Sequence, residues 1–350
     1  MRLWNGCLAA YLVFCSGAVG VRENVPMPRE APVSEAETSP VVVVALDGAM
    51  WQDVTGERGR ELMPNLRAVV DREGVELDEV YASGGSQRRP NYVSLPGYTE
   101  LFEGKRWTGC TDNFCPGATF PTIVDEIRAQ HQAPTDVAVI SSWERIAFAS
   151  TVCSRNVVVS SGTVRAQGSE WALAASDEMR QEYQAGRSAD AYPGHGDYRP
   201  DRYTAPLALS YFRTYRPAFM FVGLGDTDDY AHRGDRRGYL NALQQADRFI
   251  SGLVLEIARM GDRGKRTTVI VTADHGRSNG FVGHGGEFPE SSRTWLFAWG
   301  PRIAHARLSS GPVRHLADVA PTVREIVGLP QNPLSDGNII VELLTAAVKS

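Results

Sequence analysis

Short apolar runs recur along the chain and predict the strands of a sheet. The first run, residues 41–49, begins with four consecutive valines and ends in Asp-Gly-Ala. A run without polar residues at alternate positions is typical of a strand that is buried on both faces. Further strands are expected at residues 136–141, 218–226, 268–273 and 295–299.

The segments between these runs have the spacing of amphipathic helices. In residues 239–260 the apolar side chains repeat at helical intervals and form one stripe. Shorter helices are expected at residues 63–74, 121–130, 204–214 and 317–328. Strands that alternate with helices predict an α/β fold, in which a mostly parallel central sheet is covered by helices on both faces.

Two segments depart from this alternation. Residues 155–203 are polar, glycine-rich and irregular, so we expect them to form a small cap insertion over the core. Residues 21–39 are rich in Pro, Glu and Ser and have almost no large apolar side chains, which is typical of a flexible linker. Residues 40–350 are therefore predicted to form one domain that includes the cap.

Residues 1–20 predict a secretory signal peptide. Arg2 precedes an apolar run over residues 8–14, and small residues follow it as a cleavage site. A buried helix or a short anchor is the alternative, because the run is brief. Lipoprotein anchoring at Cys15 is a further alternative, although Phe14 before it fits that signal poorly. We expect a secreted or periplasmic protein, and no other segment has the apolar length of a membrane span.

Composition limits the classes of partner. The chain is 43% hydrophobic and 22% charged, as in ordinary globular proteins, and its net charge is -5. An acidic protein has no general affinity for nucleic acids or anionic membranes. We therefore expect a small-molecule substrate, and an acidic substrate would need local positive charge from a metal ion or from arginine.

Three cysteines remain after the predicted cleavage, Cys110, Cys115 and Cys153. In an oxidising compartment two of them would pair, and the C-T-D-N-F-C segment could close a small loop. The sequence leaves open which two form the disulfide.

Acidic residues follow three of the predicted strands. Asp47, Asp228 and Asp274 lie at or just beyond strand ends, and the carboxyl ends of parallel strands form the edge where α/β sheets bind ligands. Asp as a turn or cap residue is the alternative for any one of them. Three acids at the same edge favour a binding site.

Histidines accompany these acids at spacings that suit metal ligands. His232 follows Asp228 by four residues, His275 is adjacent to Asp274, and His284 lies in a glycine-rich loop nine residues later. Carboxylate and imidazole together favour Zn²⁺, with Mn²⁺ as the alternative. Six ligands exceed the needs of one tetrahedral site, so we predict two metal ions per chain.

The ordered motifs resemble the alkaline phosphatase superfamily, and most closely its type I phosphodiesterase/nucleotide pyrophosphatase branch. The resemblance extends over roughly residues 40–330. The family's nucleophile motif, Thr-Phe-Pro-Asn followed by Thr-Gly, corresponds without gaps to Ser94-Leu95-Pro96-Gly97 and Glu103-Gly104. The other matching segments are Val43–Gly48, the helix start at Met63–Leu66, Asp228 with His232, Asp274–Gly276, His284, and residues 316–330.

The resemblance implies a role for each of these residues. Asp228, His232 and His284 would bind one zinc ion, and Asp47, Asp274 and His275 the other. Ser94 would be the nucleophile and would form a seryl-phosphate that is then hydrolysed. A simple helix cap is the alternative role for Ser94.

Residues outside the ligand set are expected to contact the substrate. Asn113 lies where the phosphodiesterase branch has an Asn whose amide holds a phosphate oxygen, although a turn Asn would look the same. Some monoesterases of the superfamily have a Lys-x-Arg pair against the phosphate, and the nearest counterpart here is Trp143-Glu144-Arg145. Loss of the lysine should weaken binding of a dianionic monoester relative to a diester.

The sequence thus predicts a two-zinc phosphoester hydrolase that is a phosphodiesterase. A phosphomonoesterase or a phosphomutase is the alternative within the class. A sulfatase is disfavoured because Tyr98 stands where the sulfatase motif requires arginine. From another class, an inactive metal-binding module on the same fold would have the same landmarks. The oligomeric state is not predicted.

Overall fold

The computed structural model describes residues 39–163, 169–307 and 312–345. The predicted signal peptide, the lipoprotein Cys15 and all but the last residue of the predicted linker lie outside the described residues. None of the helices in the described ranges has both the length and the hydropathy needed to span a bilayer.

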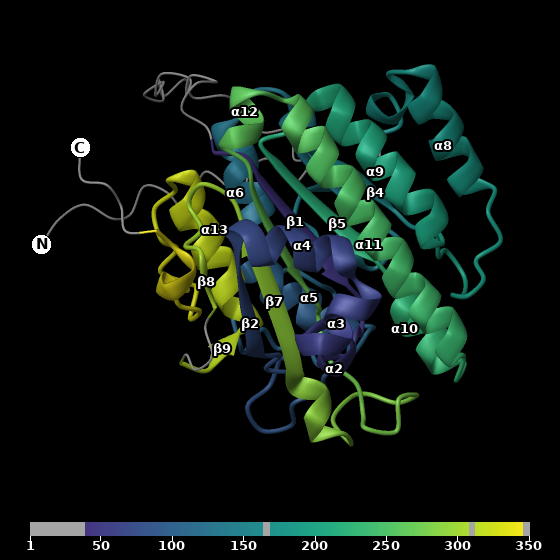
Figure 1. Cartoon of the computed structure of the whole chain (residues 1–350), viewed down its shortest axis with the longest axis vertical. Helices are drawn as coiled ribbons and strands as arrows, with labels where there is room; N and C mark the ends of the chain where they lie inside the picture. Colours follow the sequence, from purple (N-terminus) through teal and green to yellow (C-terminus); the bar gives the residue numbers. More distant parts are fainter. Residues whose placement is uncertain (1–38, 164–168, 308–311, 346–350) are drawn as a thin grey trace, which may run out of the picture.

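A central sheet runs through the molecule with helices on both faces (Figure 1). Its strands lie in the order β4-β3-β5-β1-β6-β7-β2-β8, and β9 also pairs with β2. The neighbours from β4 to β6 are parallel, whereas β7 is antiparallel to both β6 and β2. The strands are β1 (Val41–Leu46), β2 (Gly74–Tyr81), β3 (Val137–Ser141), β4 (Val158–Ser161), β5 (Phe219–Leu224), β6 (Thr268–Thr272), β7 (Arg293–Trp299), β8 (Ala306–Arg307) and β9 (Arg314–His315).

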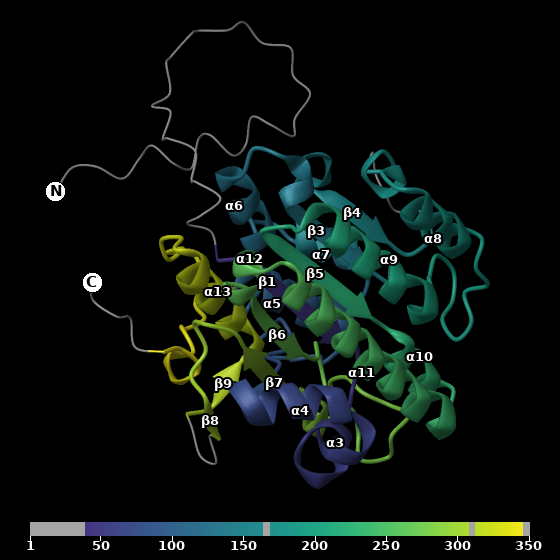
Figure 2. The same cartoon turned by 45° about the horizontal axis from the view of Figure 1, so that its top comes forward.

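Two helical layers bury the sheet (Figures 1 and 2). Alternate residues of β1 contribute to separate apolar clusters: Val42 and Val44 join the layer with α4, α9 and α11, and Val41 and Val43 join the layer with α5, α6 and α13. The helices are α2 (Trp51–Val54), α3 (Gly56–Leu62), α4 (Pro64–Glu73), α5 (Ser94–Glu103), α6 (Ile123–Gln130), α7 (Ile146–Ser150), α8 (Asp177–Arg187), α9 (Asp201–Tyr215), α10 (Asp226–His232), α11 (Arg236–Arg259), α12 (Asp262–Lys265) and α13 (Val319–Val327).

The predicted α/β fold with a mostly parallel, doubly covered sheet is confirmed. Each expected strand is present, and the all-apolar pattern of β1 corresponds to complete burial of its residues. The strand β2 was not expected, because Glu76, Asp78 and Glu79 interrupt its apolar positions. It lies beyond β7, near the sheet edge, where polar side chains have access to solvent.

Residues 155–203, the expected cap, contribute to the sheet as well. Val158–Ser161 form the edge strand β4, which pairs in parallel with β3. The four-residue strand is too short to be distinguished from a loop by its pattern alone. α8 in the same segment packs against α9. This part of the segment is therefore an extension of the core rather than a cap above it.

Candidate metal centre

The six predicted ligands lie together at the carboxyl edge of the sheet. Asp47 directly follows β1, Asp274 lies two residues beyond β6, and Asp228 lies in α10, which begins just after β5. The strands β5, β1 and β6 are adjacent and parallel, so their ends meet at one point. The sheet therefore determines where the three carboxylates converge.

Asp47, Asp274 and His275 form what we call the strand-end group. His275 Nε2 lies 3.4 Å from Asp47 Oδ1 and 3.5 Å from Asp274 Oδ2. Their ligand atoms all lie within 4.8 Å of one another, and all three residues are buried. His275 Nδ1 lies 2.8 Å from the carbonyl oxygen of Gly276 and would donate its proton there, which leaves Nε2 free as a ligand.

Asp228, His232 and His284 form what we call the helix–loop group. Asp228 Oδ2 lies 3.0 Å from His232 Nε2, and Asp228 Oδ1 lies 3.6 Å from His284 Nε2. The Nε2 atoms of the two histidines are 2.9 Å apart, so both point to one position. The His232 side chain is 45% exposed, so this group borders solvent.

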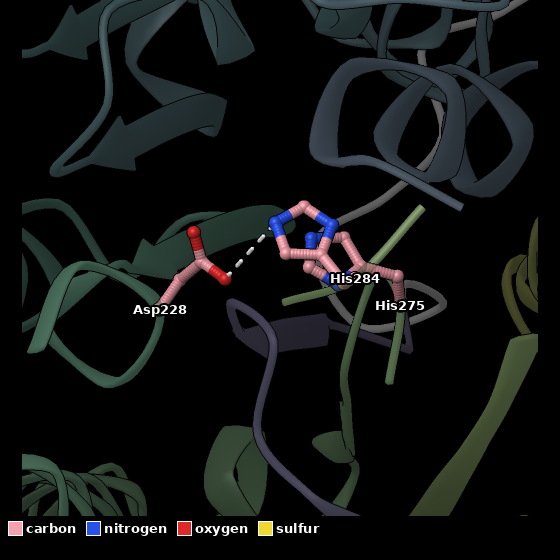
Figure 3. Close-up of side chains that lie close together, drawn as sticks. All are labelled: Asp228, His275 and His284. Carbon is pink, nitrogen blue, oxygen red and sulfur yellow. Dashed lines mark ion pairs between the residues drawn. The ribbon is translucent and has the colours of Figure 1, made fainter. Parts of the chain in front are cut away.

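The two groups are in contact. Figure 3 shows the rings of His275 and His284 stacked beside Asp228. Their centroids are 4.0 Å apart and their planes differ by 18°. Asp228, His275 and His284 themselves form a second set whose ligand atoms lie within 4.8 Å. The six residues therefore form one continuous cluster of candidate metal ligands.

The donor set fits divalent metal ions. Asp274 Oδ2 is buried without a hydrogen-bond partner, which is costly unless a cation satisfies it. Carboxylate oxygen and neutral imidazole nitrogen are the donors that zinc and related ions take from proteins. We conclude that these residues are suited to hold a divalent metal.

The ionisation of these groups reflects their burial. Burial raises the pKa of Asp47 to about 7, with a further rise from Asp228, and burial also raises the pKa of Asp274 well above its ordinary value. Burial lowers the pKa of His275 to about 4 and that of His284 to about 3. His275 and His284 are therefore neutral near pH 7, as metal ligation requires, whereas the Asp228 carboxylate raises the pKa of His232. A bound cation would displace protons from His232 and from the carboxyl groups.

Ser94 lies against the strand-end group. It is the first residue of α5, and its Oγ is 3.2 Å from His275 Nε2 and 3.4 Å from Asp47 Oδ1. The helix approaches closely because Gly97 has no side chain: a Cβ there would lie 2.1 Å from the Asp274 carbonyl oxygen. Tyr98, one turn along, donates to Asp47 Oδ2 at 3.0 Å. A hydroxyl at a helix N-terminus thus adjoins the cation position.

Asn113 also reaches this helix. The structure joins Cys110 to Cys115 by a disulfide, and Asn113 lies inside the loop that this bond closes. Its Oδ1 accepts a hydrogen bond of 2.9 Å from the backbone N–H of Leu95, the residue after Ser94. This hydrogen bond uses the oxygen of the amide, and the NH₂ group at the other end of the amide can donate to a ligand.

Arg145 contacts the loop that carries Asn113, and Trp143 contacts Tyr98 of α5. Arg145 donates from Nε and Nη2 to the Asn113 carbonyl oxygen, at 2.9 and 2.7 Å, so it stabilises the backbone of the loop. Trp143 is half-buried, and its ring centroid lies 6.4 Å from that of Tyr98. Of the predicted substrate contacts, Asn113 adjoins Ser94, whereas the Arg145 guanidinium is committed to a structural contact.

Two residues of the site were missed in the sequence. Arg277 is buried and forms an ion pair with Asp228 Oδ1. Gly48 has a φ of +55°, and a Cβ at this position would lie 2.4 Å from Asp228 Oδ1 and 2.7 Å from Arg277 Nη1. Arg277 directly follows the Asp-His-Gly motif, so a cation next to a predicted metal-binding motif was the available signal.

Comparison with known proteins supports a metal-binding site on this fold. Residues 207–331, which include α10, β6 and the loop to His284, match the family model of the Metalloenzyme superfamily. The alkaline phosphatase PafA has the same fold, with a TM-score of 0.62 at 11% identity over 88% of this chain and 99% of that chain. The chain therefore has an alkaline phosphatase-like fold, as the resemblance in the sequence predicts.

Two curated relatives match part of the chain. The 2,3-bisphosphoglycerate-independent phosphoglycerate mutase of Cereibacter sphaeroides is 32% identical over 128 residues, 35% of this chain and 23% of the mutase. The GPI ethanolamine phosphate transferase 1 of Neurospora crassa is 31% identical over 144 residues, 35% of this chain and 14% of the transferase. The chain thus matches less than a quarter of either relative's length. Structures with this fold also include a 2-O GAG sulfatase, so the fold alone leaves the type of ester open.

Proposed function

We propose that this protein is a metal-dependent phosphoester hydrolase, and specifically a phosphodiesterase, that uses two zinc ions and Ser94 as its nucleophile. The observation that carries the proposal is the position of Ser94. Its Oγ lies within 3.4 Å of two strand-end ligands, at the N-terminus of a helix. A hydroxyl, a cation position and helix N–H groups therefore converge where a phosphoryl group would bind.

Each group of ligands would hold one zinc ion in this proposal. The bound ions would supply positive charge that favours the serine alkoxide and neutralises the phosphoryl oxygens. Ser94 Oγ then forms a bond to phosphorus while the bond from phosphorus to the leaving oxygen breaks in line. Water hydrolyses the resulting phospho-Ser94 and restores the hydroxyl. Three imidazoles among six ligands favour zinc over magnesium, which prefers oxygen donors.

Asn113 would bind a non-bridging phosphate oxygen. The hydrogen bond from Leu95 N–H holds its carbonyl oxygen, so the NH₂ group is the free end of the amide. Arg145 fixes the backbone of the same residue through two hydrogen bonds. A donor held at both its side chain and its main chain is pre-organised for an anionic ligand.

The preference for a diester rests on the cations near the site. A monoester dianion has one more negative charge than a diester to neutralise. Arg145 is committed to Asn113 and Arg277 to Asp228. Trp143 is the nearest counterpart of the lysine that some monoesterases of the superfamily have. A diester instead places an apolar ester arm against the Trp143 side of the site. The match to a phosphoglycerate mutase keeps the monoesterase and phosphomutase alternatives open to test.

The deciding experiment compares bis-p-nitrophenyl phosphate, p-nitrophenyl phosphate and p-nitrophenyl sulfate in the presence of zinc. A charge-assisted hydrogen bond is worth about 1.5–3 kcal/mol, or about ten- to a hundredfold in rate. We expect kcat/KM for the diester to exceed that for the monoester by this factor, and sulfate hydrolysis to be negligible. Trp143→Lys should narrow the gap, whereas Trp107→Lys, at an exposed tryptophan beyond the other end of α5, should not.

A tenfold preference for the monoester would contradict the phosphodiesterase proposal and would favour a phosphatase. Metal dependence is checked on the same substrates. Chelation should remove activity, and zinc should restore it better than magnesium. Full activity in EDTA with magnesium alone would refute the two-zinc proposal, and a protein that binds metal without any turnover would be the inactive module.

We also propose that the protein is exported. The Cys110–Cys115 disulfide supports this proposal, because disulfides persist in oxidising compartments. N-terminal sequencing of the mature protein tests it. A chain that starts near Val21 fits cleavage by a signal peptidase, whereas a start at Cys15 would reveal a lipoprotein and an intact Met1 would contradict export.

A further inference from the structure

Arg277 contacts Asp228 of the helix–loop group, and neither the motifs nor the proposed chemistry assign it a role. Its side chain is completely buried. Nη1 pairs with Asp228 Oδ1, Nε donates to the carbonyl oxygen of Phe281 at 2.7 Å, and Nη2 donates to that of Val282 at 2.7 Å. One guanidinium therefore connects a ligand on α10 with the loop that leads to His284.

That loop requires an internal support. Phe281 has a φ of +76°, a left-handed conformation that costs a bulky side chain about 1–2 kcal/mol. Ser278 closes the turn, because it accepts from Phe281 N–H at 2.9 Å and donates to the Gly283 carbonyl at 2.8 Å. The carbonyls of Phe281 and Val282 then face inward, where Arg277 binds both. His284 lies two residues after Val282, and its Nε2 is 2.9 Å from the Nε2 of His232.

We propose that Arg277 is a positioning residue that assembles the helix–loop metal site. It orients the Asp228 carboxylate and at the same time folds the 277–284 loop so that His284 reaches the same cation. The planar guanidinium suits this task, since its forked donors reach one carboxylate and two carbonyls at once, which an ammonium group does not. The inference rests on the proposed function only in requiring that both groups bind metal.

The strand-end group should not depend on Arg277. Its members are attached to β1 and β6 through the backbone, and the hydrogen bonds of Arg277 go to Asp228, Phe281 and Val282. Loss of a residue that holds a metal ligand in place typically weakens metal affinity about 10–100-fold. Removal of Arg277 should therefore weaken one metal site and leave the other unchanged, which a general loss of structure would not do.

The test uses Co²⁺ as the probe, because binding is then measured by spectroscopy and chelator competition without any substrate. We expect wild-type protein to bind two ions. In Arg277→Met one of the two should bind about 10–100-fold more weakly, and in Arg277→Lys the same ion should show an intermediate loss. Arg236→Met is the matched control: Arg236 lies 4.9 Å from the Phe281 ring and pairs with Asp53, but it contacts no ligand. This variant should bind both ions as the wild type does.

Equal affinities in wild type and Arg277→Met, or equal weakening of both sites in the folded variant, would overturn the proposal. Should Arg277→Met fail to fold, Arg277→Lys provides the same comparison. Protease cleavage within residues 278–283 of the metal-free protein gives a second measurement, which should be faster in Arg277→Met than in Arg236→Met. Cobalt binding without phosphoester turnover would refute the proposed function alone. If the wild type binds no cobalt, the two-metal function and the role of Arg277 in assembling a metal site both fail, and the cleavage rates then test only whether Arg277 holds the 277–284 loop.

Discussion

The two halves of the metal centre are supported in different ways. The strand-end group extends from β1 and β6, which pair in parallel with Val44 opposite Val271 and Ala45 opposite Thr272. Its three residues are buried, and the backbone hydrogen bonds of the sheet set their positions. The helix–loop group comes from a short helix and a glycine-rich loop, and His232 is half-exposed. One half is therefore a product of the sheet, and the other depends on individual side-chain contacts.

Those contacts hold the start of α10. Asp201 accepts hydrogen bonds from the backbone N–H groups of Gly225 at 2.8 Å and of Asp226 at 3.0 Å. Tyr198 donates to Asp226 Oδ1 at 2.7 Å, and Thr227 donates to the Asp47 carbonyl at 2.6 Å. The segment expected to be a cap thus supplies two of the residues that fix this helix. We infer that the helix–loop half is the more easily altered of the two.

The largest expected effect comes from Ser94, which contacts only the strand-end group among the metal ligands. Ser94→Ala should lower kcat by at least about three orders of magnitude, as for other nucleophiles that act within a catalytic unit, while both metals are retained. Thr99→Ala is the control, because it removes a hydroxyl from the same helix that donates to the Leu95 carbonyl. Zinc content and turnover are measured on both variants. More than a tenth of wild-type activity in Ser94→Ala would move the nucleophile elsewhere.

The second prediction compares two carboxylates in the metal-free protein at pH 8. Arg277 and His284 outweigh burial and hold the pKa of Asp228 well below its ordinary value, so Asp228→Asn would leave the buried Arg277 without its partner. This change should reduce the free energy of unfolding by about 3–5 kcal/mol. Asp47→Asn should instead stabilise the metal-free protein, because ionised Asp47 is buried beside Asp228.

The pH dependence of the second variant follows from the raised pKa of Asp47, about 7 when folded against 3.8 in its ordinary environment. A raised pKa contributes stability that is fully present below about pH 3.8 and is lost as the pH rises through 7. The gain from Asp47→Asn should therefore be complete at pH 8 and clearly smaller at pH 5. Urea unfolding of both variants at the two pH values measures this. If Asp228→Asn and Asp47→Asn changed the free energy of unfolding in the same direction, the proposed difference between the two halves of the site would be wrong.

The smallest expected effect concerns Gly48, where the two halves meet. An Ala Cβ at this position would approach Asp228 Oδ1 to 2.4 Å and His275 Cε1 to 3.1 Å. Gly56→Ala is the matched control, since Gly56 has a similar φ of +59° and no atom within 4 Å of an added Cβ. Both changes carry the left-handed penalty of about 1–2 kcal/mol. Gly48→Ala should lose about 1–3 kcal/mol more through overpacking and should bind less zinc. Equal losses of stability in the two variants would mean that α10 moves away from the added Cβ without an energetic penalty.

The strand-end half was predictable because its signals are local. An apolar run that ends in Asp requires no knowledge of distant residues, and Asp47 and Asp274 lie at their strand ends as expected. The His284 loop was predicted through the family resemblance, and its position beside His232 agrees with that expectation. The antiparallel strand β2 and the edge strand β4 were missed, since acidic residues or shortness hid their patterns.

The arginines show why the remainder was not predictable. Arg145 was expected at the phosphate, but its guanidinium binds the carbonyl of a residue 32 positions away. Arg277 was not singled out in the sequence, although it contacts Asp228, 49 positions away. A long cationic side chain reaches many partners, and only the folded backbone selects among them. The sequence therefore predicts the carboxylate and imidazole ligands, which sit close to their own elements, better than the guanidinium groups between them.

The disulfide loop has a practical consequence for production of the protein. The amide of Asn113 is held at Leu95 by a loop that Cys110 and Cys115 close, so oxidation of the two thiols should stabilise its geometry. An expression host whose cytosol is kept reducing would yield chains that fold and load metal but lack this anchor. Preparations from such a host should differ in specific activity from those recovered through an oxidising secretory route, at equal purity and equal zinc content.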